Sequence, residues 1–131
     1  MKTVVLAAVL VVAQTKTTQD SVYTAAQAKR GETVYNASCT SCHAADLSGS
    51  GQAPSLAGKE FNDGWNGQTL ADLLDRIQTT MPADAPGSLK PADTADVVAF
   101  ILSKAMFPAG DVELPTDVAA LKEIKFVVAK P

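Results

Sequence analysis

Histidine and cysteine are scarce in this chain of 131 residues, which contains one His and two Cys. A structural zinc site needs about four nitrogen or sulfur ligands, so these residues cannot complete one within the chain. Acidic residues outnumber basic residues by 14 to 11, which argues against a nucleic-acid partner. The apolar run over residues 4–13 is too short to span a bilayer comfortably.

The two cysteines and the histidine lie together in Cys39-Thr40-Ser41-Cys42-His43. C-x-x-C-H is the attachment pattern of a c-type haem. Two thiols three residues apart lie on one face of a helical turn, so each can form a thioether bond with one vinyl group of the same porphyrin. The adjacent imidazole can then bind the iron. We therefore predict one haem c, covalently attached through Cys39 and Cys42, with His43 as an iron ligand.

Three alternatives to haem attachment exist for this motif. A thioredoxin-type redox pair would be expected in a βαβ context, which the sequence lacks. Half of a zinc site would need ligands that the chain does not have. A structural disulfide between Cys39 and Cys42 would leave the adjacent His43 without a role.

The N-terminal residues 1–13 have the pattern of a secretory signal peptide. Lys2 forms a short basic region, an apolar run follows, and Val11 and Ala13 occupy the small-residue positions before a cleavage site. The sequence thus predicts export to the periplasm, with cleavage of this segment. The alternative is an uncleaved interfacial anchor, which would be the only link of the chain to a membrane. Residues 14–22 are polar and aperiodic, which predicts a flexible leader.

Hydrophobic periodicity and capping signals predict an all-α fold, with three to four main helices around one haem. The expected helices cover about residues 24–38, 69–81 and 91–105, with a short last helix capped by Thr116. Thr69 with Asp72 resembles a capping box, and Pro82 should end the second helix at Met81. Apolar side chains recur at helical spacing at Leu70, Leu73, Leu74 and Ile77 in the second helix, and at Val118, Leu121 and Ile124 in the last.

With the haem motif between a helix and a long loop, residues 23–105 resemble the class I (monohaem) cytochromes c of the bacterial periplasmic type. Gly31 and Tyr35 match the glycine and the aromatic residue of that family's N-terminal helix. Val97 and Phe100 match their partners on the C-terminal helix. The resemblance therefore implies that the first and third helices cross at close range near Gly31, where a small residue is needed.

The same resemblance implies roles for residues that follow the motif. Pro54 and Leu56 match a Pro-x-Leu in which the proline carbonyl accepts a hydrogen bond from the axial histidine and the leucine packs on the haem. Met81 matches the methionine on the opposite side of the iron. Trp65 would either donate a hydrogen bond to a haem propionate or fill the core.

The second iron ligand is open to three alternatives from the residues alone. Met81 lies at the end of a helix before Pro82, and Met106 lies at the end of a later helix, where core or surface roles are commoner. An open or water-bound iron is the third alternative. A second histidine ligand is excluded within the chain, because His43 is its only histidine.

The resemblance implies an electron carrier and not an enzyme, with residues 23–107 as the cytochrome c domain. His/Met ligation would raise the reduction potential. Expected partners are periplasmic redox proteins, such as a quinoprotein-type dehydrogenase or a terminal oxidase, and the carrier is expected to be a monomer. Residues 108–131 form an extension packed on the domain or docking from it. The alternative functions are an open-coordination haem protein that binds a small ligand, and a haem-bearing docking subunit of a dehydrogenase complex.

Overall fold

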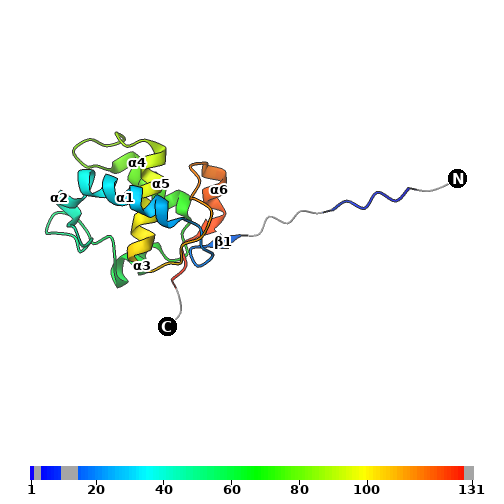
Figure 1. Ribbon diagram of the computed structural model, residues 1–131, viewed down its shortest axis with the longest axis horizontal. Helices are drawn as coiled ribbons and strands as arrows, with labels where there is room; N and C mark the ends of the chain where they lie inside the picture. The colour runs from blue at the N-terminus through cyan, green and yellow to red at the C-terminus, as the bar shows by residue number, and fades with distance from the viewer. Residues whose placement is uncertain (2–3, 10–14, 129–131) are drawn as a thin grey trace.

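The computed structural model describes residues 1, 4–9 and 15–128 of the chain, and this part is mainly helical (Figure 1). The all-α class predicted from the sequence is confirmed. None of the helices within the described residues is long and apolar enough to cross a membrane. The elements follow the order β1 (Lys16–Thr17), α1 (Ala25–Ser38), α2 (Thr40–His43), α3 (Lys59–Trp65), α4 (Leu70–Thr80), α5 (Pro91–Lys104), α6 (Val118–Lys122) and β2 (Ile124–Lys125).

Local capping interactions set the ends of the main helices. The Thr24 side chain accepts a hydrogen bond from the Gln27 backbone N–H at the start of α1. Thr69 and Asp72 form both bonds of a capping box at the start of α4, which confirms the expectation from sequence. Pro91 occupies the first turn of α5, where its missing N–H costs nothing.

The crossing of α1 and α5 is the most extensive helix contact within the described part of the chain, and the two backbones approach closely at Gly31 (Figure 1). A Cβ atom on Gly31 would lie 1.8 Å from the Asp96 carbonyl oxygen and 3.0 Å from the Phe100 Cβ atom. The rings of Tyr35 and Phe100 meet one turn further on, with centroids 5.2 Å apart. The predicted close crossing is confirmed, although the backbone that touches Gly31 belongs to Asp96 and not to its neighbour Val97.

The core extends from these helices into the C-terminal extension. Leu70, Leu73 and Leu74 of α4 are buried, as their spacing predicted. The described residues of the extension contribute to the same hydrophobic cluster and do not form a separate unit. Those that are buried in it are Leu114, Leu121, Ile124 and Phe126.

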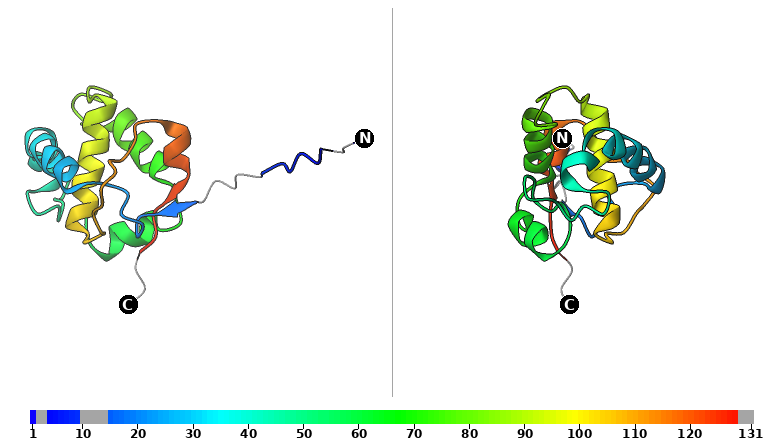
Figure 2. Two further views of the ribbon diagram at one scale, coloured as in Figure 1. Left: turned by 45° about the vertical axis from the view of Figure 1, so that its right-hand side comes forward. Right: turned by 90° about the vertical axis from the view of Figure 1, so that its left-hand side faces the viewer.

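The expected flexible leader over residues 14–22 differs from what the structure shows. Gln14 lies outside the described residues, but β1 pairs in parallel with β2 (Figure 2). Thr18 is fully buried and Val22 is a core residue. The sequence reading failed because the partner strand is more than 100 residues away, and strands of two residues have no detectable periodicity.

The predicted last helix also needs correction. Its N-cap is Asp117, whose side chain accepts the Ala120 N–H, and not Thr116. Leu121 is buried as expected, whereas Val118 is exposed and Ile124 belongs to β2. The short helix α3 was not predicted, because the segment around it lacks a regular apolar pattern.

Candidate haem-attachment site

A single helical turn positions the two cysteines and the histidine. Cys39 ends α1, with its N–H bonded to the Tyr35 carbonyl oxygen at 2.8 Å. The Cys39 carbonyl then accepts the N–H groups of Cys42 at 3.2 Å and His43 at 2.9 Å. Both thiols are free, Cys39 half-buried and Cys42 exposed. Burial, with a smaller contribution from the neighbouring Cys42, raises the pKa of the Cys39 thiol.

The imidazole of His43 is buried and held in one orientation. Its Nδ1 atom lies 2.8 Å from the Pro54 carbonyl oxygen. A carbonyl oxygen can only accept, so Nδ1 is the protonated nitrogen and Nε2 keeps its lone pair. This is the hydrogen bond that the Pro-x-Leu resemblance implied, and it leaves Nε2 able to bind a metal.

The loop between α2 and α3 is folded so that Pro54 reaches the histidine. The Leu47 side chain is fully buried, and the Leu47 backbone carbonyl oxygen accepts a hydrogen bond from the Leu56 N–H at 2.8 Å. The Gly49 N–H donates to the His43 carbonyl oxygen at 2.9 Å. A Cβ atom on Gly49, whose φ is +82°, would lie 2.6 Å from the Ala53 carbonyl oxygen. The loop is therefore closed around its own backbone beside His43.

Tyr35 connects this loop to the helix crossing, a role that the sequence analysis missed. Its hydroxyl donates to the Ala44 carbonyl oxygen at 2.6 Å. Burial is the main cause that raises the pKa of Tyr35 to about 12, so the hydroxyl remains a donor at neutral pH. The same side chain thus packs on Phe100 and holds the first residue after the motif.

The remaining predicted site residues lie in partly buried positions. Leu56 and Trp65 pack against the core without being fully covered, and the Trp65 ring lies 6.4 Å from that of Phe61. Met81 is half-buried and extended directly after α4. Asn62 of α3, which the sequence analysis did not consider, has a buried side-chain oxygen with no hydrogen-bond partner among the described residues.

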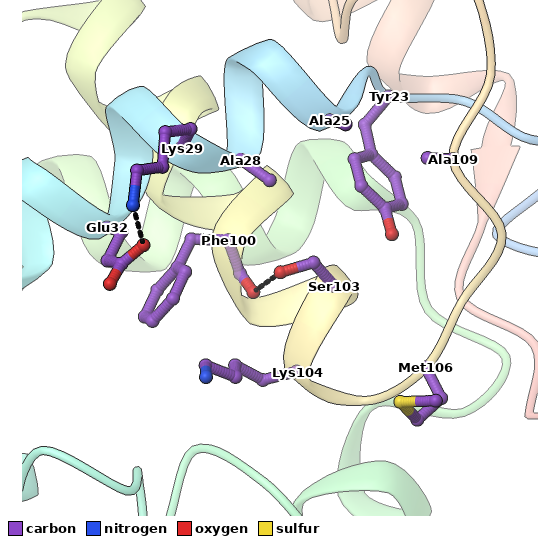
Figure 3. A pocket seen from close by; sticks show the side chains of 10 residues that line it. All are labelled: Tyr23, Ala25, Ala28, Lys29, Glu32, Phe100, Ser103, Lys104, Met106 and Ala109. Atoms are coloured by element: carbon purple, nitrogen blue, oxygen red, sulfur yellow. Dashed lines mark hydrogen bonds and ion pairs between the residues drawn. The ribbon is translucent and has the colours of Figure 1, made fainter.

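Met106 lies in a different environment from the residues of the motif. It is 87% exposed and lines a groove of about 410 Å³ on α1 and the end of α5 (Figure 3). The other lining residues include Tyr23, Lys29, Phe100 and Lys104, and none of them belongs to the haem motif.

The residues present fit a covalently attached haem. The two thiols lie in one turn and are not joined as a disulfide. The protonated Nδ1 atom of His43 leaves Nε2 available for iron. The segments after the motif also provide partly buried apolar side chains that a haem could cover, namely Leu56, Ala57, Trp65 and Ile77.

Comparison with known proteins supports the same reading. A family model described as cytochrome C oxidase, cbb3-type, subunit III matches residues 26–101, which is more than half of the chain. No curated protein and no solved structure gave a significant match. The chain therefore belongs to this family of monohaem c-type cytochrome domains and is a haem-binding electron-transfer protein.

Proposed function

We propose that the protein carries single electrons through a haem iron bound by His43 and Met81. The observation that carries the proposal is the 2.8 Å hydrogen bond from His43 Nδ1 to the Pro54 carbonyl oxygen. When bound, haem supplies an iron centre that takes up and releases one electron, and a His/Met ligand pair raises its potential. If His43 and Met81 both bind the iron, no coordination position is left for a substrate.

Each residue in this proposal has a distinct physical task. Cys39 and Cys42 attach the porphyrin. The Pro54 carbonyl orients the imidazole and makes Nε2 a more basic, stronger iron ligand. Leu56 and Trp65 exclude water from the site, and Trp65 is also a candidate hydrogen-bond donor to a propionate. Met81 is favoured over Met106 because Met81 is half-buried after α4, whereas Met106 is 87% exposed.

Substitution of each methionine tests the second ligand. Met81→Ala should remove the weak sulfur-to-iron absorption band of the oxidised protein, lower the potential and allow carbon monoxide to bind. Met106→Leu is the matched control and should change none of these properties. The reverse result would make Met106 the ligand. A wild-type protein that lacks the band and binds carbon monoxide would instead be an open-coordination haem protein.

We further propose that residues 1–13 direct export and are then removed. Val4, Val5, Leu6 and Val9 are all at least 79% exposed, and β1 begins only at Lys16. Cleavage would therefore remove an apolar segment without disturbing β1. The proposed cleavage site lies outside the described residues. The intact mass of protein purified from the periplasm tests this, and retention of the segment there would favour an anchor.

The expected partners are redox proteins, and the family match favours a terminal oxidase over a dehydrogenase. Apart from Asp46 and Asp84, the exposed residues directly beside the motif and after Met81 are small and uncharged: Ser41, Ala45, Ala83, Ala85 and Pro86. A contact built from such residues depends little on charge steering. The association rate, measured by stopped-flow electron transfer, should then change little with ionic strength. A tenfold fall on adding salt would place charged residues at the contact.

A further inference from the structure

The last described residues of the chain make a continuous contact with the segment that follows α3. We call residues 124–128 the C-terminal clasp. The Gly67 N–H donates to the Phe126 carbonyl oxygen, and the Phe126 N–H donates to the Gln68 carbonyl oxygen, both at 2.8 Å. The Val128 N–H donates to Asn66 Oδ1 at 3.0 Å. Three bonds of the clasp therefore fall on the three residues directly after Trp65.

The side chain of Phe126 joins the same segment to the core. It is fully buried and meets the rings of Phe61 on α3 and Phe107 after α5 edge-on, at 6.1 and 5.2 Å. Phe61 in turn packs beside Trp65 at 6.4 Å. The aromatic chain thus runs from the end of α5 through the clasp to Trp65.

The clasp is itself fixed by the N-terminal segment (Figure 2). Thr18 is fully buried, and its hydroxyl donates to the Val127 carbonyl oxygen and accepts the Val127 N–H, each at 3.0 Å. The Thr18 N–H also donates to the Lys125 carbonyl oxygen at 2.9 Å. Thr18 and the clasp therefore hold each other in place next to α3.

The clasp also touches α4, where Lys125 pairs with Thr69, but the other helices near the site have further attachments. Helix α5 packs extensively on α1 and also contacts α4, and α4 contacts α6. Within the described residues, α3 has no comparably extensive contact with another helix. The clasp is thus a principal attachment of α3 to the rest of the protein.

We propose that the C-terminal clasp positions α3 and Trp65 against the haem and so sets the reduction potential of the iron. The inference rests on the proposed electron-carrier site, in which Trp65 borders the haem. Solvent exposure is one of the factors through which a protein sets such a potential. An α3 that moves away from the core would admit water to the site and lower the potential.

Phe126→Ala in the haem-loaded protein is the main test. Amide hydrogen exchange at residues 59–68 should become at least tenfold faster than in the wild type, with α5 unchanged, and the potential should fall. Leu114→Ala is the matched control, because Leu114 is a buried residue of the same extension whose backbone bonds go to Gln27 of α1. The control should leave both the exchange in α3 and the potential unchanged.

Thr18→Val decides the question if Phe126→Ala fails to fold. It removes the two hydroxyl bonds to Val127 with little change in volume. Amide exchange in α3 should become faster and the potential should fall, both by less than in Phe126→Ala. Phe126→Leu should restore most of both properties. Unchanged exchange in α3, or faster exchange with an unchanged potential, overturns the proposal. Amide exchange in α3 does not depend on Met81, but the potential does, so the sulfur-to-iron band is measured in every variant. A fall in potential that comes with loss of this band would be due to Met81 and would also overturn the proposal.

Discussion

The α1–α5 crossing and the contact of the C-terminal extension with α1 hold the same helix by different means. At the crossing, two backbones touch, and there is no room for a Cβ atom at Gly31. One turn before Gly31 on α1, a polar side chain binds backbone groups of the extension, as Gln27 does with Leu114. The crossing should therefore be sensitive to added side-chain volume. The contact of the extension should be sensitive to the loss of hydrogen-bond partners for buried polar groups.

The largest expected effect is at the crossing. Gly31→Leu should lower the free energy of unfolding by more than about 3 kcal/mol, at or beyond the usual range for overpacking, despite the better helix propensity of Leu. The reason is that even its Cβ atom would lie 1.8 Å from the Asp96 carbonyl oxygen. Thermal unfolding of the haem-loaded protein measures the change. A variant as stable as the wild type would mean that α5 does not lie against this position.

Gly64 provides the control for that substitution. It lies within α3, where an added Cβ atom would meet no atom within 4 Å apart from the adjoining backbone of its own helix. Gly64→Ala should therefore stabilise the protein, by up to about 1 kcal/mol, through helix propensity alone. Equal destabilisation by both glycine substitutions would remove volume as the explanation for Gly31.

The next largest effect is expected where the extension binds α1. Gln27 is buried, and its side-chain amide donates to the Leu114 carbonyl oxygen at 3.2 Å and accepts the Leu114 N–H at 2.8 Å. Gln27→Leu should cost about 2–3 kcal/mol, because two buried backbone groups lose their partners. Chemical denaturation measures this. An unchanged free energy of unfolding would show that water can replace the Gln27 amide, and that this contact is less tightly packed than the α1–α5 crossing.

Tyr23→Phe should have a smaller effect in the same region. The Tyr23 hydroxyl donates to the Phe107 carbonyl oxygen at 2.6 Å in a buried position. Its removal leaves one acceptor without this partner and should cost about 1 kcal/mol, measured by the same denaturation experiment. A loss as large as that of Gln27→Leu would indicate that the ring itself moves.

The smallest effect is expected for the exposed ion pair of Arg30 with Glu113. Their atoms lie 2.7 Å apart, and the hydrogen bond from Arg30 is the main cause that lowers the pKa of Glu113. A lowered carboxyl pKa stabilises the fold above the unfolded value of about 4.3, and this contribution disappears as the pH falls through the folded value. The stability difference between wild type and Glu113→Gln should therefore shrink in acid, as thermal melts across this pH range would show. A difference independent of pH would contradict the assignment.

Much of the site followed from local sequence. Cys39, Cys42 and His43 are adjacent, so their chemistry could be read without a fold. The capping box of Thr69 and Asp72 spans one turn and depends only on short-range geometry. The Pro54 partner of His43 was available through the family resemblance, since spacing alone does not bring a carbonyl oxygen to an imidazole.

The sequence by itself determined the haem motif and the main helices, because each depends on residue type at short, regular spacing, whereas the small residue at Gly31 was implied by the family resemblance. Only the tertiary structure decided the pairing of β1 with β2, the burial of Thr18 and the attachment of α3 through Phe126. These contacts join segments from about 60 to more than 100 residues apart. They depend mainly on backbone hydrogen bonds, which every residue type except proline can form, so they leave no pattern in the sequence.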